Sequence, residues 1–169
     1  MRAAARRVIT ALVLLLALSL PLTAQQPGAT EPYMGALIGA HVGVDYLFEG
    51  FLIGSQAHLL LDPWGRVSII PNAEYEFRRG LRDWQANLDL AVMPVRGVYL
   101  GGGLAYRNSI FDEEVGRATE RGYSAFVGYR EPARPGRISP QIELRWSFVA
   151  DIKPRMLTVG ANYPLLLFR

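Results

Sequence analysis

The chain has 169 residues, a length that fits one domain, and half of its residues are hydrophobic. It contains no cysteine, which excludes disulfides, zinc–thiolate sites, a thiol nucleophile and a cysteine-linked lipid anchor. The formal charge of +3 does not indicate a nucleic-acid partner. Three of the arginines lie within the first seven residues, and the rest of the chain has 15 basic and 15 acidic side chains.

The N-terminal segment is predicted to be a secretory signal peptide. Arg2, Arg6 and Arg7 precede the apolar run Val8–Leu20, and the small residue Ala24 closes the segment. The 13 residues of the apolar run are too few for a helix that spans a bilayer, which needs about 20. The predicted organisation is a cleaved signal peptide over 1–24, a flexible lead over 25–32 and a folded domain over 33–169.

Eight segments of the folded domain alternate apolar and polar residues with a period of two, which predicts β-strands. Each has 10 to 14 residues. Strands of soluble proteins most often have about five or six residues, whereas a tilted membrane-crossing strand needs about nine to eleven. The predicted strands are Tyr33–Tyr46, Gly50–Leu61, Arg66–Arg78, Asp83–Met93, Val98–Arg107, Glu120–Arg130, Arg137–Val149 and Arg155–Leu167.

The connections between these strands alternate in kind. Asp62–Gly65, Pro94–Gly97 and Glu131–Gly136 are short turns with proline and glycine. The others are more charged and include the longest loop. They are Leu47–Glu49, Arg79–Arg82, Asn108–Thr119 and Ala150–Pro154. Short turns at one end and variable polar loops at the other are typical of an outer-membrane barrel, although an ordinary antiparallel meander also needs turns at both ends.

One face of every strand is apolar, and the other mixes glycines with long polar side chains. Glycine weakens a strand that faces solvent, but inside a narrow barrel it makes room for a long neighbour. We therefore expect the polar face to point inward and its charges to pair, because an unpaired buried charge is costly. The predicted polar network of the lumen is His41, Asp45, Gln56, His58, Asn72, Glu74, Glu76, Arg78, Asn87, Asp89, Arg107, Arg130, Glu143 and Arg145.

Two hairpin registers follow from the expected turn positions. A turn around Gly80 sets Phe77 opposite Trp84, with Glu76 opposite Gln85, Glu74 opposite Asn87 and Asn72 opposite Asp89. A first hairpin that turns near Phe48 sets His41 opposite Gln56 and diagonal to His58.

Aromatic residues are expected in two bands near the strand ends, where membrane–water interfaces select them. Tyr99 has the wrong parity to face outward. The predicted aromatic girdle is Tyr46, Phe51, Phe77, Trp84, Tyr106, Tyr123, Tyr129, Trp146, Phe148 and Tyr163.

With this pattern over Tyr33–Arg169, the chain resembles the small eight-stranded outer-membrane β-barrels of Gram-negative bacteria, the outer-membrane-protein A or X kind. The resemblance implies an all-β, eight-stranded antiparallel up-and-down transmembrane barrel. Members usually end on an aromatic residue that the barrel-assembly machinery recognises. Here Phe168 is penultimate and Pro164 interrupts the strand, so either Leu167 takes the terminal outward place or the last residues leave the regular ladder.

The residues do not indicate an enzyme. Some outer-membrane barrels are lipid A deacylases, which need a His-x-Ser pair and a carboxylate, but Val42 and Gly43 follow His41, and two leucines follow His58. His41, His58 and Asp45 raise the alternative of a metal site, but two histidines without a third ligand at fixed spacing favour two lumen histidines that hydrogen-bond to their polar neighbours. No cofactor and no metal site are predicted.

The predicted function is that of an integral outer-membrane barrel with a structural or surface-interaction role. Its predicted partners are outer-membrane lipid, the barrel-assembly machinery and an extracellular partner at the loop 108–119. Two alternatives remain open. One is a narrow pore for small solutes or ions. The other is a soluble exported calycin-like barrel whose apolar face points inward and binds an apolar ligand.

Overall fold

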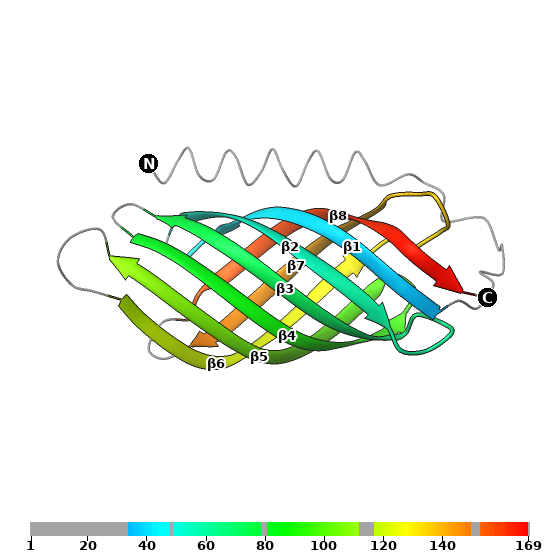
Figure 1. Cartoon of the computed structure of the whole chain (residues 1–169), viewed down its shortest axis with the longest axis horizontal. Helices are drawn as coiled ribbons and strands as arrows, with labels where there is room; N and C mark the ends of the chain where they lie inside the picture. Colours follow the sequence, from blue (N-terminus) through cyan, green and yellow to red (C-terminus); the bar gives the residue numbers. More distant parts are fainter. Residues whose placement is uncertain (1–33, 48, 79–80, 112–116, 150–152, 169) are drawn as a thin grey trace. The chain divides into compact units, whose positions relative to one another are not determined.

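The structure is a computed structural model that describes residues 34–47, 49–78, 81–111, 117–149 and 153–168. The predicted signal peptide and lead lie outside these residues. The structure contains eight strands that all pair antiparallel (Figure 1). They are β1 (Met34–Asp45), β2 (Gly50–Leu60), β3 (Val67–Arg78), β4 (Leu81–Val95), β5 (Val98–Phe111), β6 (Arg117–Arg130), β7 (Ser139–Val149) and β8 (Arg155–Phe168).

The eight strands form one closed barrel in chain order. Each strand pairs with the next, and β8 pairs with β1 over Met34–Asp45 to close the sheet. Closure gives each described strand a neighbour on both sides, so the sheet has no free edge strand. The strands are tilted against the long direction of the barrel, as Figure 1 shows. The predicted all-β, eight-stranded antiparallel barrel is confirmed.

The three connections at the end of the barrel where β8 finishes (the turn end) each contain a glycine with a positive φ angle. Gly65 and Gly97 have φ angles of 64° and 84°, a region that favours glycine. The carboxylate of Asp62 accepts a hydrogen bond of 2.7 Å from the amide of Val67 and one of 3.3 Å from the amide of Trp64. The turn between β2 and β3 is therefore held by its own side chain.

At the opposite end of the barrel (the loop end), the longest predicted loop is shorter than expected. The predicted loop Asn108–Thr119 is largely β-structure, because β5 continues to Phe111 and β6 begins at Arg117. Asn108 pairs with Thr119, and its side-chain amide donates to the Thr119 hydroxyl at 3.0 Å. Polar side chains do not prevent a hairpin from continuing, since pairing satisfies the backbone groups. Asp112, Glu113 and Glu114 lie outside the described residues.

Both expected hairpin registers are wrong by two residues. Trp84 pairs with Tyr75, not Phe77, because β3 runs to Arg78 and β4 begins at Leu81. Two-residue connections are the commonest in hairpins, and the expected four-residue loop was too long. Accordingly Gln85 pairs with Glu74, Asn87 with Asn72, and Asp89 with Ile70.

In the first hairpin, His41 pairs with Gly54, while Gln56 pairs with Gly39. The turn is still near position 48, but the pairing is centred one residue earlier than the expected register requires, and Glu49 takes a φ of 58° in the turn. A slip of two residues preserves the alternation, so the assignment of faces does not change.

The last strand contains an irregularity at Pro164. Between β1 and β8, Leu37 pairs with Pro164, whereas Ala36 pairs with Leu166, so Leu165 is extra. Proline has no N–H to donate to the ladder, which explains why the bulge forms beside it. The phase of β8 changes there, and Phe168 pairs with Met34.

Candidate functional site: the polar lumen

The candidate site is the interior of the barrel, which the polar face of every strand lines. All fourteen predicted network residues lie on the inward side, and all but Arg78, which is half-buried, are buried. The apolar residues that alternate with them are on the outer surface. Leu88, for example, is 56% exposed, whereas its neighbour Asn87 is 5% exposed. The soluble barrel with an apolar interior is therefore wrong, because the interior is polar.

A chain of alternating charges lies in the loop-end part of the lumen. Arg78 donates to Asp45 at 2.8 Å and to Glu76 at 2.6 Å. The other oxygen of Glu76 accepts from Arg107 at 3.1 Å, and Arg107 also pairs with Asp83. These five residues come from β1, β3, β4 and β5. They link four strands by charge-assisted bonds, which are the stronger kind.

Arg145 is the centre of the middle part of the lumen. Its guanidinium donates to Asp89 at 2.7 Å and to Glu143 at 2.8 Å, and it lies 4.6 Å from the centre of the Phe126 ring. Ser124 donates to the second oxygen of Asp89 at 2.8 Å. One buried cation therefore pairs with two buried carboxylates, and the Ser124 hydroxyl adds a neutral donor to Asp89, so that each buried charge has a partner.

An amide ladder extends this central group towards the loop end. Asn72 donates to Asp89 at 2.9 Å, and Asn87 donates to Asn72 at 2.6 Å. Gln85 then donates to Asn87 at 2.9 Å and to Ser147 at 2.8 Å. The last contact joins β4 to β7, so side chains meet across the lumen at this level.

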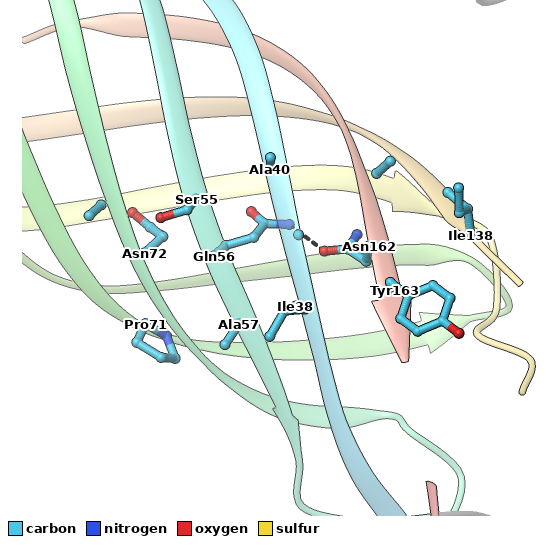
Figure 2. A pocket seen from close by; sticks show the side chains of 13 residues that line it. Ile38, Ala40, Ser55, Gln56, Ala57, Pro71, Asn72, Ile138, Asn162 and Tyr163 are labelled. Carbon is cyan, nitrogen blue, oxygen red and sulfur yellow. Dashed lines mark hydrogen bonds between the residues drawn. The ribbon is translucent and has the colours of Figure 1, made fainter. Parts of the chain in front are cut away.

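A second crossing lies in the turn-end part of the lumen. Arg130 on β6 contacts Nδ1 of His58 on β2 at 2.6 Å, and β2 and β6 face each other in an eight-stranded barrel. The other ring nitrogen of His58 is 3.0 Å from the amide nitrogen of Gln56, which donates to Asn162 at 2.9 Å (Figure 2). Asn162 donates in turn to Gln141 at 2.8 Å. These contacts fill the lumen from wall to wall.

His41 lies apart from His58. It pairs with Gly54, whereas His58 pairs with Leu37, four residues along the ladder. The Nε2 atom of His41 is 3.6 Å from a carboxylate oxygen of Glu74. Gly54 on β2 lies between them, because it pairs with His41 on β1 and with Glu74 on β3. A Cβ at Gly54 would collide with the imidazole, so glycine is needed there for the ring to reach Glu74. Among the described residues, no group of three or more His, Cys, Asp or Glu could hold a metal ion.

Several buried lumen residues were missed in the sequence, although parity pointed to most of them. Asp83 precedes Gln85, Asn87 and Asp89 at the same period of two. Small hydroxyl side chains were overlooked in the same way. The buried serines of the lumen are Ser68, Ser109, Ser124, Ser139 and Ser147.

The inward face is also less uniformly polar than predicted. Ile70, Ala91, Tyr99 and Phe126 form a buried apolar cluster inside the barrel, with Met93 packed against it. Tyr99 has the inward position that its parity indicated, and its hydroxyl donates to Glu143 at 2.9 Å. Alternation alone does not distinguish an apolar interior position from a polar one.

The predicted aromatic girdle lies on the outer surface. Tyr106, Trp146 and Phe148 are half-buried, and the other seven are exposed. Neighbouring strands bring several rings together near the loop end. The ring centroids are 5.3 Å apart for Trp84 and Tyr106, and 5.0 Å apart for Tyr123 and Phe148.

Small residues form a row across the outer surface. Ala161, Ala40, Ser55 and Ala73 pair in turn from β8 to β3, and all four are exposed. All four residues line an open hollow of about 830 Å³, whose lining side chains Figure 2 shows. Among the described residues, no helix is long and apolar enough to cross a membrane.

Solved structures share this fold at low sequence identity. The N-terminal β-barrel domain of Pseudomonas aeruginosa OprF is 14% identical, with a TM-score of 0.59 over 79% of this chain and 99% of that one. Neisserial surface protein A (NspA) is 12% identical, with a TM-score of 0.54 over 78% and 95%. Yersinia pestis outer membrane protein Ail is 13% identical, with a TM-score of 0.53 over 80% and 100%.

The comparisons extend to a designed protein. A de novo transmembrane β-barrel is 11% identical, with a TM-score of 0.53 over 80% of this chain and 99% of that one. No protein-family model and no curated protein matches the sequence. The chain thus has the fold of the small eight-stranded outer-membrane β-barrels, as the sequence predicted.

Proposed function

We propose that this protein is an integral barrel of the Gram-negative outer membrane with a structural or surface-interaction role and no enzymatic activity. One observation carries the proposal. The closed barrel has its charged side chains inside and its large apolar side chains outside. An apolar exterior is unfavourable in water but favourable in the hydrocarbon of a membrane. In lipid, every backbone group must also be hydrogen-bonded within the protein, as it is in a closed barrel.

The filled lumen supports a structural role over a pore. Contacts from β2 to β6 and from β4 to β7 cross the interior at two levels, and the chain of charges adds a third. The proposed partners are outer-membrane lipid around the barrel, the assembly machinery during insertion, and an extracellular partner at residues 108–119.

Spin labels on neighbouring outward and inward residues test the proposal. Cysteine is introduced at Leu88 or at Asn87 and labelled, after which the protein is folded into vesicles. Oxygen, which concentrates in lipid, should relax the label at Leu88 much more than the label at Asn87. A second inward label at Ala91 guards against local distortion by the first. Higher oxygen accessibility at both inward positions than at Leu88 would refute the proposed orientation.

Localisation is tested separately on the full-length protein. Outer-membrane fractions should contain it, and a closed barrel should migrate differently on a gel before and after boiling. Recovery in the soluble fraction would refute the proposal.

A further inference from the structure

The three connections at the turn end share a feature that the lumen does not explain. Each places a strongly exposed apolar side chain next to an exposed arginine, either directly or two residues away. Trp64, Val95 and Ile138 are 61%, 60% and 65% exposed. The pairs are Trp64 with Arg66, Val95 with Arg96, and Ile138 with Arg137.

These connections also carry an excess of positive charge. The described segments 61–66, 96–97 and 131–138 contain four arginines and two carboxylates, Asp62 and Glu131. The Asp62 carboxylate already accepts hydrogen bonds from its own turn. None of the four arginine side chains forms an ion pair with a carboxylate of any described residue. They are Arg66, Arg96, Arg134 and Arg137.

The position of this arginine rim, defined as these four residues, matches a lipid–water boundary. Two exposed tyrosines of the girdle, Tyr129 on β6 and Tyr163 on β8, lie in the turn-end part of the outer surface. Below the rim the outer wall is apolar, with Leu90, Val92 and Leu100 exposed. A side chain at this level reaches hydrocarbon in one direction and headgroups in the other.

We propose that the arginine rim binds the phosphate groups of anionic phospholipids in the membrane leaflet at the turn end. The three apolar side chains lie among the upper parts of the acyl chains. The guanidinium groups donate paired hydrogen bonds to the phosphates, a geometry that suits arginine. Juxtamembrane basic residues are attracted to anionic lipid surfaces, so the rim enriches such lipids around the barrel. This inference rests on the proposed membrane insertion.

The chain supplies its own reporter for this binding. It has three tryptophans, and the double variant W84F/W146F leaves Trp64, which is two residues from Arg66, as the single tryptophan. This variant is folded into vesicles of phosphatidylcholine with a minor fraction of phosphatidylglycerol. Bromine atoms, which quench tryptophan fluorescence, are placed on the acyl chains of either the anionic or the zwitterionic lipid, at equal mole fraction.

Anionic brominated lipid should quench Trp64 more strongly than zwitterionic brominated lipid. The expected enrichment is about fivefold, the effect of one well-placed basic residue near an anionic surface. In R66Q/R96Q/R134Q/R137Q, built on the same background, the two lipids should quench equally. The control R121Q/R155Q removes two exposed arginines from the outer faces of β6 and β8, nearer the loop end, and should keep the preference of Trp64.

The outcomes separate the two proposals. Equal quenching by both lipids in the unsubstituted rim would overturn the inference, and would point to a protein partner for the arginines. Absence of quenching by either lipid would overturn the membrane insertion itself. If the fourfold variant does not fold, added salt on the unsubstituted rim replaces it. The preference must then fall as salt rises, and a salt-independent preference also counts against the proposal.

Discussion

The hydroxyl of Tyr99 on β5 donates a 2.9 Å hydrogen bond to Glu143 on β7, across the strand that lies between them. Gly128 on β6 pairs with both residues, and a Cβ there would lie 2.6 Å from the tyrosine hydroxyl. The glycine therefore makes room for a contact between strands that are not neighbours.

The same arrangement recurs in the lumen. Gln56 reaches Asn162 across Gly39, and Ser124 reaches Asp89 across Gly103. These glycines explain how a narrow interior can join strands two apart along the sheet.

Replacing Gly128 by alanine should destabilise the barrel by about 1–3 kcal/mol, the usual effect of overpacking. If the Tyr99 ring is the group displaced, G128A should have a smaller effect in a Y99A background than alone, because the two changes share one contact. Urea unfolding of the four proteins in vesicles measures the coupling. Strict additivity would show that Gly128 acts through the backbone instead.

Replacing Arg145 by methionine should reduce the free energy of unfolding by about 3–5 kcal/mol, since Asp89 and Glu143 would remain buried without their cation. Neutralising both carboxylates in R145M/D89N/E143Q should recover part of this loss. The exposed Arg121 provides the control, and R121Q should change the stability by less than about 0.5 kcal/mol. A small effect of R145M would mean that solvent reaches the pair.

The barrel should give no steady single-channel conductance in planar bilayers. R130S shortens the side chain that meets His58 from the opposite strand, yet it should stay closed as well, because Arg145 and Arg107 fill the lumen at other levels. Stable unitary currents from the parent protein would favour the alternative of a narrow pore.

The β3–β4 register can be tested with engineered cysteines, since the natural chain has none. Ala73 pairs directly with Ala86, and opposed residues have Cα atoms about 4.5–5.5 Å apart, within the range of a disulfide. The pair A73C/A86C should therefore oxidise readily. Y75C/A86C, which the register expected from the sequence would oppose, should oxidise poorly. Ready oxidation of Y75C/A86C with poor oxidation of A73C/A86C would instead support the register expected from the sequence.

The sequence by itself determined the fold class and the faces of the strands. A period of two assigns Asn87 and Leu88 to opposite sides without knowledge of the neighbours. Strand lengths then indicated a membrane, and the glycines on the polar side indicated a narrow interior. The polar side is inside because the apolar side is too large for an eight-stranded lumen.

Only the tertiary structure decided which residues meet. The two-residue errors in register arose because turn length, not alternation, sets the pairing, and alternation is the same after a slip of two. Contacts between β2 and β6, such as Arg130 with His58, depend on the closure of all eight strands. The arginine rim also depends on the closed barrel. Its three turns are far apart in sequence, and they lie at one end of the barrel because every second connection is at that end. Parity is a local property of the chain, whereas distance across a closed sheet is a property of the whole barrel.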